Sequence, residues 1–199
     1  MYIIAGKYRR RRLKHPKDRT FRPTKSVVRE AIFNILGPRI EGASFVDLCS
    51  GSGAVGIEAE SRGAGNVTCV DRDTKYLIQN KQALNLDFDI VRMDALKYIN
   101  RMAPVDILYF DPVWSESHMY EQAFKLLLPS VFTTEERVTQ DQNGLLCQKL
   151  TSNGVLFIEH NSKYALPEMV IKFVNKQYQY GNSMLSVIKN KAHANDTIK

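Results

Sequence analysis

A carboxylate, a proline and a tryptophan close an apolar segment in the middle of the chain, and together they could hold a planar amine. The segment 107–110 is followed by Asp111, Pro112 and Trp114. The Asp111 carboxylate and the Pro112 carbonyl are acceptors that can take both hydrogens of an exocyclic amine, and the Trp114 ring can stack on a nucleobase. A structural interpretation stays open for Trp114, which could simply fill the core.

A glycine-rich turn follows another apolar segment and is typical of a nucleotide-binding loop. Residues 45–48 precede Gly51, Gly53 and Gly56, after which the pattern becomes helical. Glycines let a ligand approach the backbone closely, and the start of a helix offers free N–H groups. A plain tight turn could explain the glycines alone. Asp47, inside the apolar segment, favours a ligand site because a carboxylate is costly to bury without partners.

Two further acidic residues stand at the ends of predicted strands. Asp71 follows the apolar segment 67–70, about 20 residues after the glycines, where dinucleotide-binding folds place a carboxylate for the ribose. Asp94 follows the segment 88–92 and could cap the next helix, contact an adenine amine, or do both. The carboxyl ends of parallel strands share one edge of an open α/β sheet, so these side chains should lie near Asp111.

Predicted strands and helices alternate from residue 45 onward, which favours a doubly wound, mostly parallel sheet. We expect strands over 45–49, 67–70, 88–92, 105–110, 154–159, 169–178 and 183–189, the last two as an antiparallel pair, and helices over 54–62, 73–85, 95–101 and 117–128. Residues 1–13 should form a hairpin, followed by a helix that Thr24 caps and Gly37 ends. The chain then divides into a basic N-terminal extension (1–39), a main domain (40–190) and a disordered tail (191–199).

Basic charge is concentrated at the N-terminus. The chain has 28 Lys and Arg residues against 21 Asp and Glu, and residues 1–39 hold twelve of the basic residues but only two of the acidic ones. Such a one-sided cluster with aromatic residues among it favours binding of a polyanion, although a solvated face is the usual origin of a charge run. The residues expected to bind RNA are Lys7, Arg9, Arg10, Arg11, Arg12 and Arg22.

Composition excludes several classes of protein. A chain of 199 residues with 44% hydrophobic content suits one globular domain, and its apolar segments are too short for a membrane span. We expect a cytoplasmic protein. Cys49, Cys69 and Cys147 are scattered and show no metal-binding spacing, so we expect no metal and interpret them as small buried hydrophobes rather than nucleophiles.

These motifs resemble the S-adenosylmethionine-dependent methyltransferases of Rossmann-like fold, and within them the bacterial RsmD family. That family methylates the exocyclic N2 amine of a guanine in 16S ribosomal RNA. The resemblance rests on residues 3–9, residues 22–34, the segment 47–58 and the motif 111–114. It implies a class I fold with a seven-stranded, mostly parallel sheet and an antiparallel final strand. It also implies S-adenosyl-L-methionine as cofactor and ribosomal RNA or the assembling small subunit as partner; a monomer is our default.

The resemblance implies roles for individual residues. Asp111, Pro112 and Trp114 would hold the target base, and the amine would attack the sulfonium methyl directly. Glu159 and the segment 180–183 match family positions, but no chemistry is assigned to them. The residues implied to bind the cofactor are Asp47, Gly51 and Gly53 (methionine part), Asp71 (ribose), Asp94 (adenine amine), and Thr24, Cys49, Arg72 and Ala95 around them.

One residue departs from the family pattern. The family usually has Asp-Pro-Pro before its aromatic residue, whereas Val113 stands in third place here. Valine does not fix φ and restores an N–H, so the loop should be less rigid. Val113 leaves open a non-catalytic RNA-binding assembly protein. An N6-adenine methyltransferase acting on DNA or RNA also stays open, because an Asp-Pro-x-aromatic motif suits any planar exocyclic amine. The segment 129–150, which we expect to be partly helical, is also longer than the usual connector.

Overall fold

The computed structural model describes residues 1–17, 22–128 and 147–190. The tail 191–199, predicted to be disordered, and most of the segment 129–150, predicted to be partly helical, lie outside the described residues. Both therefore stay predictions. Everything below refers to the described part of the chain.

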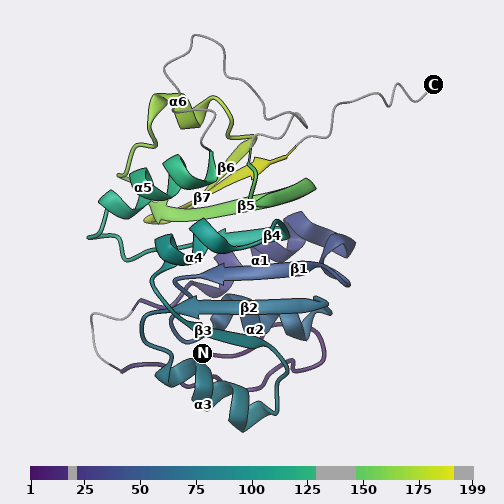
Figure 1. Ribbon diagram of the computed structural model, residues 1–199. Helices are drawn as coiled ribbons and strands as arrows, with labels where there is room; N and C mark the ends of the chain where they lie inside the picture. Colours follow the sequence, from purple (N-terminus) through teal and green to yellow (C-terminus); the bar gives the residue numbers. More distant parts are fainter. Residues whose placement is uncertain (18–21, 129–146, 191–199) are drawn as a thin grey trace, which may run out of the picture.

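A single seven-stranded sheet forms the centre of the molecule (Figure 1). The strand order is β3-β2-β1-β4-β5-β7-β6. β1 to β5 pair in parallel, whereas β7 is antiparallel to both β5 and β6. This confirms the predicted fold class. The strand bounds are β1 Ser44–Leu48, β2 Asn66–Asp71, β3 Asp89–Arg92, β4 Val105–Phe110, β5 Leu150–Asn161, β6 Lys176–Tyr180 and β7 Ser183–Lys189.

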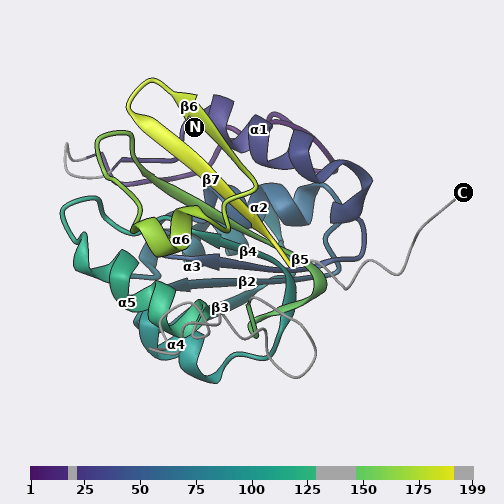
Figure 2. The ribbon, with the colours of Figure 1, turned by 90° about the horizontal axis from the view of Figure 1, so that it is seen from above.

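Helices cover both faces of the sheet, as Figure 2 shows for α1 and α2 on one side and α4 and α5 on the other. Successive residues of a strand point to opposite faces. Ile107 and Tyr109 therefore join the core under α1, α2 and α3, while Leu108 and Phe110 join the core under α4, α5 and α6. The helix bounds are α1 Ser26–Leu36, followed by the short 3₁₀ helix η1 Gly37–Ile40, then α2 Ala54–Ser61, α3 Lys75–Leu84, α4 Ala95–Arg101, α5 His118–Leu127 and α6 Glu168–Ile171.

The strand order reverses between β1 and β4, and this is where the site lies. β1 continues through α2 to β2 on one side, while β4 lies on its other side. Ligands of open α/β sheets bind outside the carboxyl ends of the strands at such a switch point. The loop after Leu48 and the loop after Phe110 both start there.

The N-terminal segment is fastened to the main domain by buried polar side chains of α2. Ile4 and Ala5 donate their backbone N–H groups to the Glu58 carboxylate, at 2.8 and 2.9 Å. Glu58 also lies 3.5 Å from the Arg29 guanidinium of α1, and both side chains are almost fully buried. Ser61 accepts a hydrogen bond from Tyr8 N–H at 3.0 Å. These contacts place the basic segment at a defined position beside the sheet.

The predicted hairpin over residues 1–13 exists in a reduced form. One antiparallel bridge joins Tyr2 and Arg12, and the backbone N–H groups of Ile3 and Leu13 donate to the carbonyls of Arg11 and Met1. Ile3 and Leu13 are buried in the core. Regular strands do not form within 1–13, but the hairpin still presents its basic side chains outward.

Three boundary predictions were wrong. Thr24 does not cap α1, which begins at Ser26 after Lys25 without a side-chain cap. The predicted strand 169–178 is mostly helix and turn, because α6 occupies Glu168–Ile171 directly after Pro167, and β6 starts only at Lys176. A proline with its fixed φ favours a helix start. β5 is also longer than predicted and extends to both sides of 154–159.

Candidate functional site

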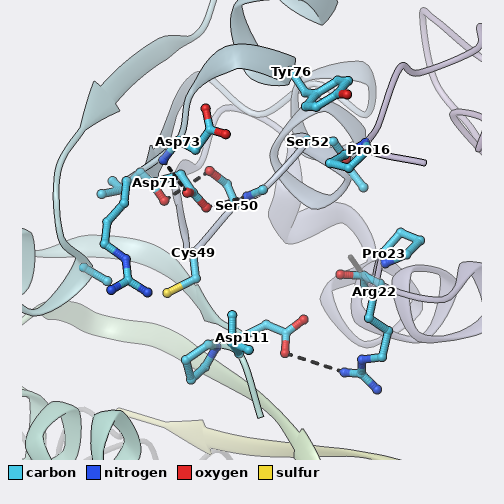
Figure 3. A pocket seen from close by; sticks show the side chains of 18 of the residues that line it. Pro16, Arg22, Pro23, Cys49, Ser50, Ser52, Asp71, Asp73, Tyr76 and Asp111 are labelled. Atoms are coloured by element: carbon cyan, nitrogen blue, oxygen red, sulfur yellow. Dashed lines mark hydrogen bonds and ion pairs between the residues drawn. The ribbon is translucent and has the colours of Figure 1, made fainter. Parts of the chain in front are cut away.

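A pocket of about 400 Å³ opens at the switch point between β1 and β4 (Figure 3). This volume falls in the range of small-molecule sites. Its lining combines carboxylates with apolar side chains. The carboxylates suit hydroxyl or amino donors of a ligand, and the apolar side chains suit a flat base. The lining residues are Pro16, Arg22, Pro23, Thr24, Cys49, Ser50, Gly51, Ser52, Ala54, Val70, Asp71, Arg72, Asp73, Tyr76, Met93, Ala95, Asp111, Pro112, Val113, Trp114, Ser115 and Met119.

The glycine loop forms one wall of the pocket. Cys49, Gly51 and Gly53 all adopt positive φ, at 62°, 56° and 82°. Gly53 is the residue before α2, and an added Cβ there would lie 2.6 Å from the Leu77 side chain. Glycine therefore suits position 53, because both the positive φ and the close approach of the Leu77 side chain disfavour a Cβ there. Cys49 and Gly51 line the pocket, whereas Gly53 supports the loop from behind.

Asp47 lies beneath the loop rather than in the wall of the pocket. It is 1% exposed, and its Oδ2 accepts a hydrogen bond from Gly56 N–H at 2.8 Å. Its Oδ1 is buried without a partner among the described residues. Burial raises the pKa of Asp47 to about 7, and the Gly56 bond opposes the shift. The structure thus shows Asp47 holding α2 against β1, and its contact with a cofactor stays a prediction.

Asp71 stands at the end of β2 and faces the glycine loop. Its Oδ2 accepts from Gly51 N–H at 2.7 Å and its Oδ1 from Asp73 N–H at 2.9 Å. Figure 3 shows Asp71 beside Ser50 and Asp73 on one side of the pocket. Arg72 also lines the pocket and forms an ion pair with Glu116 at 3.0 Å.

Asp94 caps a helix, as one of the two interpretations predicted. Its Oδ1 accepts from the backbone N–H groups of Leu96 and Lys97 at the start of α4, at 3.0 and 3.2 Å. Its neighbours Met93 and Ala95 line the pocket, while Asp94 itself does not. A contact of Asp94 with an adenine amine remains a prediction.

The opposite side of the pocket brings together Asp111, Trp114 and Arg22. The Arg22 guanidinium lies 3.0 Å from the centre of the Trp114 ring and 4.0 Å from the Asp111 carboxylate. Figure 3 shows the Arg22 and Asp111 side chains pointing toward each other. Trp114 therefore faces the pocket rather than filling the core, although its Nε1 is buried without a partner among the described residues. Arg22, predicted to bind RNA, lies inside the pocket.

A second buried carboxylate stands behind Asp111. Glu159, near the end of β5, is 1% exposed and lies 3.4 Å from the Arg22 guanidinium. The Tyr109 hydroxyl donates to Glu159 Oε2 at 2.7 Å and lies 3.4 Å from both Asp111 Oδ2 and Thr24 Oγ1. Burial and the Glu159 charge raise the pKa of Asp111 well above its usual range, while Arg22 opposes the shift.

Sequence reasoning missed Glu159 as part of this site. The signal was available, because Glu159 follows the apolar run of β5 just as Asp111 follows that of β4, and the two strands pair in parallel with Phe110 beside Ile158. Further lining residues such as Tyr76 and Met119 come from the first turns of α3 and α5. No residue type or spacing in the sequence marks those two as functional.

The remaining basic residues predicted to bind RNA lie on the N-terminal hairpin. Arg9, Arg10, Arg11 and Arg12 are exposed, as is Lys7, whose ammonium lies 5.1 Å from the centre of the Tyr8 ring. Pro16, a few residues further along, reaches the rim of the pocket. The hairpin and the pocket are therefore connected by a short length of chain.

Two of the three cysteines lie in the core, and the third lines the pocket. Cys69 and Cys147 are buried as expected, whereas Cys49 is only partly buried, so the interpretation as a buried hydrophobe was wrong for Cys49. Burial raises the pKa of all three thiols. Over residues 1–17, 22–128 and 147–190, the structure contains no cluster of potential ligands that could hold a metal ion. Across the same described ranges, no helix has the length and apolarity needed to cross a membrane.

Known proteins are similar to this chain in both sequence and fold. The chain matches the family described as "Conserved hypothetical protein 95" over residues 1–189. YlbH of Bacillus subtilis, a candidate rRNA methyltransferase, is 31% identical over 199 residues, covering 95% of this chain and 98% of YlbH. Ribosomal RNA small subunit methyltransferase D of Escherichia coli K12 is 32% identical over 152 residues, covering 72% and 76%.

A solved structure extends this agreement to three dimensions. The Escherichia coli protein yhhF, a candidate methyltransferase, superposes with a TM-score of 0.74 at 26% identity, over 96% of this chain and 98% of yhhF. Family match, sequence identity and fold agree over nearly the whole chain. The chain therefore belongs to the RsmD family of methyltransferases.

Proposed function

We propose that this protein transfers a methyl group from S-adenosylmethionine to the exocyclic N2 amine of a guanine in small-subunit ribosomal RNA. The observation that carries the proposal is the shared pocket: the glycine loop with Asp71 forms one side, and Asp111, Pro112 and Trp114 form the other. A cofactor and a flat base can therefore meet in one cavity. We further propose that it acts as a monomer in the cytoplasm, on RNA of the assembling subunit.

The residues present fit the cofactor. S-adenosylmethionine combines hydroxyl and ammonium donors with a flat adenine, and when bound it supplies an electrophilic methyl group. Asp71 and Asp73 offer carboxylates at the end of β2, where a ribose is expected. Val70, Met93 and Ala95 give an apolar wall beside them that suits the adenine. Cys49 and Gly51 keep their backbone open toward the same space.

Asp111 and Pro112 would act on the nucleophile. The lone pair of an arylamine is delocalised into the ring, which makes the amine a poor nucleophile. Hydrogen bonds from its two hydrogens to the Asp111 carboxylate and the Pro112 carbonyl would favour a more tetrahedral nitrogen and stabilise the positive charge that develops there. Trp114 would stack on the base and fix its plane, so that the lone pair points at the methyl group.

The RNA would reach this pocket only with its target base unstacked. A base inside a helix cannot enter a pocket of this size, so it must be flipped out or already unpaired. The exposed arginines of the N-terminal hairpin would bind neighbouring phosphates, which positions the RNA without reading its sequence. Val113 also lines the pocket and is 58% exposed.

Transfer of a labelled methyl group to small ribosomal subunits, isolated from cells that lack this protein, tests the proposal. We expect label in the rRNA with the wild-type protein and a loss of about 100-fold or more with Asp111→Asn, since the carboxylate stabilises charge only in the transition state. Asp89→Asn, at the exposed start of β3, is the matched control and should retain activity. Cofactor binding without any transfer would favour the non-catalytic alternative.

A further inference from the structure

The Arg22 side chain occupies the place where the proposed function requires a base. Its guanidinium lies over the Trp114 ring at 3.0 Å, within 4.0 Å of Asp111 and 3.4 Å of Glu159. Its second terminal nitrogen, Nη1, donates to Ser183 Oγ at 3.5 Å. The side chain lines the pocket and is 36% exposed to solvent.

A guanidinium is a close chemical relative of one edge of guanine. In both groups a planar carbon carries three nitrogens, and in guanine two of these, N1 and N2, bear hydrogens on the Watson–Crick edge. A carboxylate is acceptor-only, so it suits N–H groups on such an edge. A site that holds the guanidinium of arginine between a ring and two carboxylates is therefore complementary to guanine.

We propose that Glu159 and Asp111 together read the guanine edge, and that Arg22 fills this position whenever no base is bound. The inference rests on the proposed function and adds Glu159 as a specificity-determining residue. Asp111 takes a hydrogen of the N2 amine, and Glu159 takes the N1 hydrogen. Arg22 leaves the face of Trp114 when the base enters.

The contacts of Glu159 support this division of roles. Its Oε2 is held by the Tyr109 hydroxyl at 2.7 Å, which fixes the carboxylate and leaves Oε1 facing Arg22. Burial raises the pKa of Tyr109 well above its usual range, so the hydroxyl keeps its proton and remains a donor. Once Arg22 moves away, Oε1 needs another donor, because an unpaired buried carboxylate is costly.

The same geometry disfavours adenine. Adenine has an exocyclic amine, but the ring nitrogen beside it is an acceptor rather than an N–H group. That lone pair would face the Glu159 carboxylate, and a site built to bind an N–H rejects an analogue that lacks it. Glu159 thus gives a physical reason for choosing guanine over adenine, which Asp111 and Pro112 alone do not provide.

The first test asks whether the pocket binds a guanidinium. Methylguanidine is titrated into the Arg22→Ala protein, and the fluorescence of Trp114, the one tryptophan in the sequence, reports binding. We expect saturable binding to Arg22→Ala, at least about tenfold weaker binding to wild type, and weaker binding to Arg22→Ala/Glu159→Gln. Arg39→Ala, which removes an exposed arginine of η1, should behave like wild type. Equal binding to wild type and Arg22→Ala would overturn the proposal.

The second test distinguishes the role of Glu159 from that of Asp111 and uses the Arg22→Ala protein. Calorimetry compares guanosine with 2-aminopurine riboside, which keeps the 2-amine but lacks the N1 hydrogen. We expect 2-aminopurine riboside to bind about tenfold to a hundredfold more weakly than guanosine, and Glu159→Gln to bring that ratio close to one. A ratio that Glu159→Gln leaves unchanged would refute the role of Glu159. Neither test involves methyl transfer, so both remain valid if the proposed reaction fails.

Discussion

At the scale of single residues, the site depends on how two buried carboxylates are neutralised. Asp111 directly follows β4, Glu159 lies near the end of the neighbouring β5, and both lie near the Arg22 guanidinium. The Asp111 carboxylate stabilises the positive charge that develops on the amine only when it is ionised, whereas burial and the Glu159 charge raise its pKa. Arg22 opposes this shift in the free enzyme.

This balance predicts the pH dependence of methyl transfer. Activity should be present above the raised pKa of Asp111 and be lost as the pH falls through it. Because Arg22 lowers that pKa, Arg22→Gln should move the acidic limb of kcat/KM to higher pH. The profile of kcat/KM reports groups of the free enzyme, in which Arg22 occupies the pocket. An acidic limb at the same pH in both proteins would contradict this account.

Asp47 gives a second prediction at this scale, on stability. Its pKa is about 7 in the folded protein and 3.8 in the reference state, so the folded protein binds the proton more tightly than the unfolded chain. The contribution of Asp47 to stability is therefore fully present at low pH and is lost as the pH rises through 7. Urea unfolding measures the free energy of unfolding at pH 5 and at pH 8. The decrease from pH 5 to pH 8 should be smaller for Asp47→Asn than for wild type. An equal loss would show that Asp47 is not the titrating group.

At the scale of elements, α2 connects the glycine loop to the N-terminal segment. Its first residues follow Gly53, and Gly56 in its first turn donates to Asp47 below. Glu58, two residues later, accepts hydrogen bonds from the backbone of Ile4 and Ala5. The helix that forms a wall of the pocket thus also fixes the position of the basic hairpin.

Glu58→Gln should therefore destabilise the whole fold. Glu58 is fully buried and forms ion pairs with Arg29 and Arg62. Loss of its charge leaves the buried Arg29 without a counter-ion, which typically costs about 3–5 kcal/mol. Denaturant unfolding measures this change. Glu30→Gln, on the exposed face of α1, is the control and should change stability by less than about 0.5 kcal/mol. Similar effects of both substitutions would argue against the anchoring role of Glu58.

Elements were predictable from the sequence where their pattern was long or repeated. β1, β2 and β4 are apolar segments that each end at or beside an aspartate, and the parallel arrangement brings those ends together. α6 has only four residues, too few to show a helical period, so the segment looked like a strand. The place of Arg22 was not predictable, because it depends on contacts with residues far along the chain. Asp111 lies 89 positions after Arg22, and Ser183 lies 161 positions after it.

At the scale of the whole molecule, the exposed basic charge and the proposed chemistry come from different parts of the chain. The exposed arginines lie on the N-terminal hairpin, which α2 holds beside the sheet, and the pocket opens at the edge between β1 and β4. A substrate that is both a polyanion and a source of one planar base suits such an arrangement. Ribosomal RNA has both properties.

Charge reversal on the hairpin should weaken RNA binding and flatten its salt dependence. Each phosphate contact that is lost lowers the slope of log affinity against log salt by about 0.7–0.9. Arg9, Arg11 and Arg12 are changed to Glu, and a matched triple change of exposed residues on α4, α5 and beside α6 (Arg101, Lys125 and Lys172) serves as control. Affinity for S-adenosylmethionine should stay the same in both variants. A slope that only the control changes would place the RNA on the other face.

The chemical identity of the methylated nucleoside tests the central claim most directly. Ribosomal RNA methylated by this protein is digested to nucleosides, which are separated and identified by mass. The account predicts N2-methylguanosine with the wild-type protein and its loss with Asp111→Asn. N6-methyladenosine, or no methylated nucleoside from a protein that binds the cofactor, would contradict the assignment of Asp111, Trp114 and Glu159 to a guanine-binding site.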